Sequence, residues 1–167
     1  DDVADHTLKM LRGAMAECRM GNPGRLTTDI GPVIDAEAKA NIENHIQAMR
    51  AKGRPVFQAV RDNSEDARER RSGTFVPPTL IERASFDELK KEVFGPVLHV
   101  VRYNRNNLNE LIDQINASGY GLTLGVHTRI DETIAQVTGN AKVGNLYVNR
   151  NMVGAVVGVQ PDRKSVV

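Results

Sequence analysis

The second half of the chain alternates short β-branched apolar runs with amphipathic stretches, and this rhythm constrains the fold more than any other feature. Runs typical of strands cover residues 97–103, 122–128 and 143–148, and helical patterns cover residues 108–115 and 131–139. Strands that alternate with helices in this order pair in parallel, with helices packed on the sheet. We therefore predict an α/β fold with a mostly parallel sheet and helices on both faces.

The first half predicts two helices. Apolar residues at helical spacing predict the first helix from Val3 to Cys18. The second is predicted to begin after an N-cap at Asp35 and to end before Gly53. Its apolar stripe includes His45, which we expect to be a hydrogen-bonded core residue and not a metal ligand.

The middle of the chain predicts strands and surface turns. Residues 55–60 and 74–76 read as strands, the second ended by Pro77 and Pro78, and residues 61–71 read as a polar surface loop. The stretch from Ser85 to Glu88 matches the capping box that begins many helices.

Composition excludes several classes of protein. With 22 basic and 21 acidic side chains, the net charge of +1 gives no reason to expect nucleic acid or an anionic membrane as partner. No apolar run approaches the roughly 20 residues of a membrane-spanning helix. The single cysteine, Cys18, excludes an internal disulfide and is expected to pack as a small apolar residue. The four histidines lack metal-ligand spacing. We expect a cytoplasmic protein without a metal site.

Two segments can carry binding chemistry. Glu92 and Phe94 stand two residues apart in an extended stretch, so both side chains can face one ligand, a carboxylate for a ribose diol and a ring for a flat heterocycle. An exposed Glu92 with a core Phe94 at a turn is the simpler alternative on these residues alone. Residues 149–158 follow the last predicted strand and are rich in small residues, whose backbone N–H groups can bind a carboxylate.

Four motifs give the chain a resemblance to the aldehyde dehydrogenase superfamily. Residues 92–96 (Glu-Val-Phe-Gly-Pro) resemble its Glu-x-Phe-Gly-Pro signature; residues 31–34, 119–122 and 144–149 resemble its Gly-Pro-x-Ile/Val, Tyr-Gly-Leu and final core strand elements. The resemblance runs over residues 1–161. Residues 15–23 and 149–161 are most similar to the L-glutamate γ-semialdehyde (Δ1-pyrroline-5-carboxylate) dehydrogenase module of bifunctional proline utilisation A enzymes.

The resemblance implies a role for each matching residue. Glu92 would bind the nicotinamide-ribose hydroxyls of NAD, Phe94 would support the nicotinamide ring, and the backbone amides of Gly154 and Ala155 would bind the α-carboxylate of an aldehyde substrate. The family reaction is thiolate attack on the aldehyde, hydride transfer to NAD⁺ and thioester hydrolysis. It also implies a homo-oligomeric parent. FAD would belong to a separate proline dehydrogenase domain, and nucleic acid binding only to a further N-terminal domain.

The chain also departs from the family pattern. The nucleophilic cysteine, the oxyanion-stabilising Asn, the general-base Glu and the NAD-binding domain are expected upstream of residue 1. We therefore expect residues 1–161 to be a partial catalytic domain that is inactive alone. Residues 162–167 replace the family's Phe-Gly-Gly and read as a non-native tail, a translated sequencing adapter. Two alternatives stay open: an aldehyde dehydrogenase of other substrate specificity, or a non-catalytic binding or structural fragment.

Overall fold

The computed structural model describes residues 3–60, 73–88 and 91–152, and the chain divides into two compact units, residues 1–102 and 103–167. The first unit contains helices α1 (Ala4–Glu17) and α2 (Ala36–Ala51), strands β1 (Val56–Gln58), β2 (Thr79–Arg83) and β3 (Val97–Val101), and the 3-10 helix η1 (Phe86–Glu88). The second contains the 3-10 helix η2 (Arg105–Asn107), helices α4 (Leu108–Ala117) and α5 (Asp131–Asn140), and strands β4 (Thr123–Val126) and β5 (Asn145–Val148).

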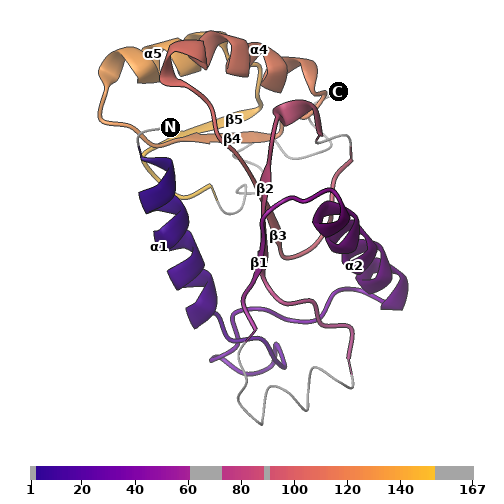
Figure 1. Cartoon of the computed structure of the whole chain (residues 1–167). Coiled ribbons are helices and arrows are strands. Elements are labelled where there is room, and N and C mark those ends of the chain that lie inside the picture. Colours follow the sequence, from indigo (N-terminus) through magenta and orange to yellow (C-terminus); the bar gives the residue numbers. More distant parts are fainter. Residues whose placement is uncertain (1–2, 61–72, 89–90, 153–167) are drawn as a thin grey trace. The chain divides into compact units, whose positions relative to one another are not determined.

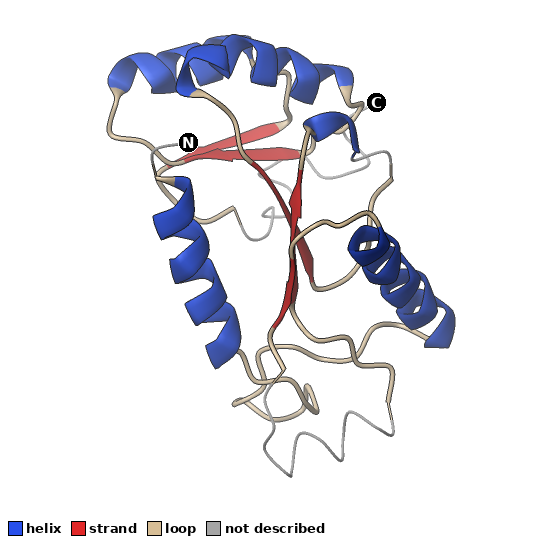
Figure 2. Cartoon of the chain, viewed as in Figure 1, coloured by secondary structure: helices blue, strands red, loops and turns tan. Residues whose placement is uncertain are grey.

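The first unit is a three-stranded sheet in the order β1-β2-β3, with α1 and α2 on its opposite sides (Figures 1 and 2). Strands β2 and β3 are parallel, with Ile81 opposite His99, whereas β1 runs antiparallel to β2, with Phe57 opposite Leu80. Arg12 of α1 donates to Glu82 of β2 at 2.7 Å. The charged pair holds α1 on the face of the sheet that lies away from α2.

Helix α2 has the boundaries that the sequence predicts. The Asp35 side chain accepts a hydrogen bond from the Ala38 N–H at 2.7 Å, which satisfies one of the free donors of the first turn. Gly53 lies just beyond the other end with φ of +69°, a left-handed conformation that glycine adopts without a steric penalty. Both ends of the predicted helix are confirmed.

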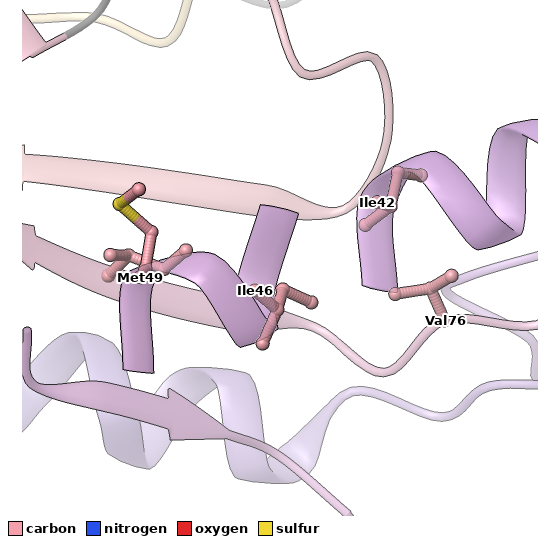
Figure 3. Packing of buried hydrophobic residues seen from close by; sticks show 5 residues of the cluster. Ile42, Ile46, Met49 and Val76 are labelled. Atoms are coloured by element: carbon pink, nitrogen blue, oxygen red, sulfur yellow. The ribbon is translucent and has the colours of Figure 1, made fainter. Parts of the chain in front are cut away.

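The core of the first unit lies between α2 and the sheet. It is built from Ile42, Ile46 and Met49 of α2, Val76, and Ile81 of β2, all at most 5% exposed. Figure 3 shows the helix side chains stacked along one stripe, with Val76 reaching toward Ile42. Side chains that alternate along a strand point to opposite faces, so Ile81 meets α2 while its neighbour Glu82 meets α1.

The second unit pairs β4 with β5 in parallel, with Thr123 opposite Asn145. Helices α4 and α5 lie on one side of these two strands in Figure 1. The ends of the helices are joined by Asn116, which donates to the Asn140 carbonyl at 2.9 Å and accepts from the Lys142 N–H at 2.8 Å. The strand–helix–strand rhythm and the parallel pairing are confirmed for β4, α5 and β5, whereas β3 pairs with β2 in the first unit. The α/β fold is confirmed for the chain.

One sequence prediction is wrong in the middle of the chain. Residues 74–76 form no strand, and the strand β2 lies beyond the two prolines, at residues 79–83. Proline has no N–H to donate, so pairing starts at Thr79, whose N–H donates to the Pro96 carbonyl at 2.9 Å. After Ser85 the described chain forms only the short helix η1, and Glu88 pairs with Arg54. Residues 61–71 lie outside the described residues.

Cys18 also differs from expectation. It caps the C-terminus of α1 and is partly exposed, with its sulfur 3.6 Å from the Ala14 carbonyl. Only Leu8 is buried within α1, because the helix packs on the sheet through few side chains. Cys18 is therefore a helix-end residue and not part of the buried core.

Candidate functional site

The segment before β3 presents Glu92 and Phe94 outward. Both side chains are exposed, Phe94 by 79%, whereas Val93 between them packs against the core cluster. This alternation is what an extended backbone produces, and it turns the carboxylate and the ring away from the core. The alternative in which Phe94 is a core residue is wrong.

Close packing fixes this segment on α2 and β2. A Cβ atom at Gly95 would overlap the Cδ1 methyl of Ile42, so a larger residue here would require that side chain to shift. The Val97 N–H donates to the Gly95 carbonyl at 2.7 Å, and the Pro96 carbonyl accepts from Thr79 at 2.9 Å. These contacts therefore attach the turn after Phe94 to α2 and β2.

The residues present fit the nicotinamide half of NAD. An exposed carboxylate can accept hydrogen bonds from two ribose hydroxyls, and a ring that is 79% exposed leaves a face for a flat heterocycle. The roles of Glu92 and Phe94 remain predictions.

The segment predicted to bind the substrate carboxylate begins beyond β5. Asn149 ends the strand with φ of +51° and makes two hydrogen bonds of 2.9 Å with the backbone of Thr128. These bonds fix the ends of the two parallel strands together at the edge where ligands collect in α/β sheets. Gly154 and Ala155 themselves lie outside the described residues.

Sequence reasoning missed a contact between two histidines. His45 of α2 and His99 of β3 bring their Nε2 atoms to 2.9 Å, with ring planes at 85°. One imidazole donates and the other accepts, so His45 is hydrogen-bonded, as predicted. The partners are separated by 54 residues. No spacing in the sequence indicates the pair.

The surroundings of this pair favour neutral imidazoles. Burial lowers the pKa of His99 to about 4, and the positive charge of Arg83 and the neighbouring His45 act in the same direction. Burial also lowers the pKa of His45, with further contributions from the charges of Arg83 and Lys52. Protonation of the accepting Nε2 would replace this hydrogen bond with two N–H groups that face each other. Acid is therefore expected to weaken the contact between the two rings.

We expect the free energy of unfolding of the 167-residue chain to fall as the pH drops from 7.5 to 5. Unfolded histidine titrates near 6.5 and folded His99 near 4, so within this window the unfolded chain binds more protons and is favoured. The pKa shift of His99, taken in full, would lower the free energy of unfolding by about 2 kcal/mol at pH 5. Solvent screening of the partly buried ring reduces this loss to about 1.5 kcal/mol. Urea unfolding at each pH measures it.

The variant His99→Gln removes the titrating ring, so its stability should change less over the same pH range. His6→Gln, at an exposed position of α1, is the matched control and should keep the full dependence. Equal pH dependence in both variants would contradict this origin of the acid sensitivity.

Other site chemistries find no support in the described part of the chain. No helix there is long and apolar enough to cross a membrane. No three His, Cys, Asp or Glu side chains of these residues gather as a metal site requires.

Comparison with known proteins identifies the family. The model of the aldehyde dehydrogenase family matches residues 1–161. The chain is 88% identical over 161 residues to the bifunctional protein PutA of Klebsiella aerogenes and to that of Escherichia coli K12, and each match covers 96% of this chain but 12% of the relative. It is 31% identical over 163 residues to the 1-pyrroline-5-carboxylate dehydrogenase of Bacillus cereus strain B4264, again 96% of this chain, and 30% of that protein.

Solved structures agree with the sequence relatives. A variant of the Bradyrhizobium japonicum proline utilization A superposes with a TM-score of 0.85 at 45% identity, over 96% of this chain and 16% of that one. The Bdellovibrio bacteriovorus proline utilization A superposes with a TM-score of 0.81 at 32% identity, over 96% of this chain and 16% of that one. Betaine aldehyde dehydrogenase of Staphylococcus aureus in complex with NAD⁺ superposes with a TM-score of 0.74 at 25% identity, over 89% of this chain and 29% of that one. The chain, which spans about one eighth of the length of its PutA relatives, belongs to the aldehyde dehydrogenase family.

Proposed function

We propose that the longer protein to which this chain corresponds oxidises L-glutamate γ-semialdehyde to L-glutamate with NAD⁺, as one activity of a bifunctional proline-oxidising enzyme. The 88% identity over 161 residues with relatives named bifunctional protein PutA carries this proposal. A relative named 1-pyrroline-5-carboxylate dehydrogenase, matched over 96% of the chain, supports the same substrate, because that ring hydrolyses to the semialdehyde.

Four residues of this chain are assigned to binding in the proposal. The exposed Glu92 carboxylate accepts hydrogen bonds from the nicotinamide ribose, and the exposed Phe94 ring buttresses the nicotinamide. The backbone amides of Gly154 and Ala155 bind the substrate α-carboxylate, which selects an amino-acid aldehyde. When bound, NAD⁺ supplies the acceptor for the hydride of the reaction.

The 167-residue chain alone is proposed to be inactive. Its one cysteine, Cys18, caps a helix in the first unit, and the covalent nucleophile of the family is expected in a segment upstream. Without that nucleophile, binding groups cannot carry out the reaction. The longer protein is proposed to be a cytoplasmic homo-oligomer with FAD confined to a separate proline dehydrogenase domain. Residues 162–167 lie beyond the family match and are proposed to be a non-native tail.

Exchange of a segment between proteins tests the proposal. Residues 1–161 of this chain replace the matching segment of the Klebsiella aerogenes PutA, and we name the resulting chimaera the exchange enzyme. We expect it to form NADH from the semialdehyde within about threefold of the rate of the unaltered relative, because 88% of the exchanged residues are identical and such substitutions are mostly small in effect. The isolated chain should form no NADH.

A panel of aldehydes then separates the alternatives. A higher kcat/KM for an aldehyde without the α-carboxylate than for glutamate semialdehyde would point to another substrate specificity. A folded, oligomeric exchange enzyme without turnover on any aldehyde would favour the non-catalytic interpretation and would contradict the proposal.

A further inference from the structure

An open pocket of about 590 Å³ lies in the first unit beside the C-terminal half of α2 and the 3-10 helix η1. Its walls include the cations Lys52, Arg83 and Lys91, the imidazole of His45, and the apolar side chains of Met49 and Val93. The volume is in the range that small-molecule sites occupy, about 300–1,000 Å³. Neither Glu92 nor Phe94 is among its lining residues.

Arg83 is the unusual member of this lining because it is a buried cation, only 7% exposed. Its Nη1 donates to the Glu88 carbonyl at 2.5 Å, and its Nη2 lies 3.5 Å from the sulfur of Met49, a weak acceptor. Its Nε has no hydrogen-bond partner among the described residues. A guanidinium offers five N–H donors, and buried donors left unmatched are costly. An oxygen that displaced the thioether at Nη2 would make a stronger bond.

The charges around Arg83 favour an anion in the pocket. Lys52 and Lys91 add two positive charges to the lining, which also includes Glu88; Oε1 of the Glu88 carboxylate pairs with Arg54, and its Oε2 has no hydrogen-bond partner among the described residues. Asp87 is the acidic lining residue that remains, and it is exposed. After burial itself, the charge of Arg83 is the next cause that lowers the pKa of both His45 and His99. The imidazoles therefore experience a positive potential.

We propose that this pocket binds a small molecule through a carboxylate or phosphate group, held by Arg83 and Lys52 with its apolar part against Met49 and Val93. Both groups present oxygens that match the forked donors of a guanidinium. This binding site is an addition to the dehydrogenase activity and does not depend on it, because its residues are not those assigned to cofactor or substrate.

Titration of the full 167-residue chain with inorganic phosphate, and separately with succinate, tests the proposal. Sodium chloride keeps the ionic strength constant, and NMR follows the backbone amides and the imidazole protons. We expect saturable shifts of the pocket residues with at least one of the two anions. Binding should also raise the pKa of His45 and His99, since a nearby negative charge favours the protonated imidazole. Saturation by one anion alone assigns the class of ligand.

Matched variants locate the site. Lys52→Ala removes an exposed charge at the end of α2 and should weaken binding about three- to fivefold, the effect of one partly screened ion pair. Lys9→Ala removes the same charge from an exposed position of α1 and should change the affinity by less than about twofold. Arg83→Met keeps the side-chain length without the charge and should weaken binding at least about tenfold.

Circular dichroism decides whether Arg83→Met is folded, and if it is not, the pair Lys52→Ala and Lys9→Ala is sufficient. Shifts that stay linear with both anions would overturn the proposal, as would equal affinities in the two lysine variants. Neither result would alter the turnover of the exchange enzyme, so failure here is distinguishable from failure of the proposed dehydrogenase function.

Discussion

Ile46→Ala is expected to destabilise the first unit by about 2–5 kcal/mol, the range measured for truncating a large buried aliphatic side chain. Ile46 is 2% exposed and lies in the middle of the α2 stripe, between Ile42 and Met49 (Figure 3). The lost methyl groups leave a cavity that the sheet beneath cannot fill without moving Ile81. Urea unfolding followed by circular dichroism measures the change.

The same substitution at Ile34 is the control, because that side chain is 90% exposed and buries almost no area. Ile34→Ala should change the free energy of unfolding by less than about 0.5 kcal/mol. If the two variants unfolded at the same urea concentration, α2 would not pack on the sheet as described, and the attachment of the Glu92–Phe94 segment to α2 would be in doubt.

The sequence predicts α2 well because its signals are local. Asp35 caps the first turn through its own side chain, Gly53 supplies the left-handed residue after the last, and the apolar stripe between them repeats at helical spacing. Each signal acts within a few residues, so no tertiary partner is needed to interpret it. Helices α4 and α5 are likewise predicted from the helical spacing of their apolar residues, although neither has a side-chain N-cap hydrogen bond.

Strand β2 could not be recognised because its pattern depends on distant partners. Pro77 and Pro78 look like the end of a strand, and the strand that follows them ends in Glu82 and Arg83, two charges that are atypical of a central strand. In the structure Glu82 is paired with Arg12 of α1. The compensating charges, on Arg12 and Arg102, lie 70 and 20 residues away in the chain, where no local pattern indicates them.

The candidate site also combines features that the sequence predicts with features that depend on tertiary packing. The outward direction of Glu92 and Phe94 follows from the alternation of an extended chain, which is visible in the sequence. The sequence does not predict how this segment is attached to α2, because that depends on the contact of Gly95 with Ile42. The buried Arg83 and the His45–His99 pair are likewise products of tertiary packing.

Glu92→Ala in the exchange enzyme is expected to raise the KM for NAD⁺ about 100-fold. A carboxylate that accepts two hydrogen bonds from a ribose diol is worth about 3 kcal/mol, since hydrogen bonds to charged groups contribute about 1.5–3 kcal/mol each. Glu92→Gln retains one acceptor oxygen without the charge and should give an intermediate loss of about tenfold. Steady-state kinetics measures both, and NADH fluorescence gives the cofactor affinity without turnover.

The control is Glu43→Ala, which removes an exposed carboxylate from the solvent side of α2. It should leave the KM for NAD⁺ within about twofold, because an exposed charge outside the site contributes little to binding. A role in cofactor binding also requires that the KM for the aldehyde change much less than the KM for NAD⁺ in Glu92→Ala. If Glu92→Ala and Glu43→Ala had the same KM for NAD⁺, the carboxylate of Glu92 would not bind the cofactor, and the outward-facing pair would need another ligand.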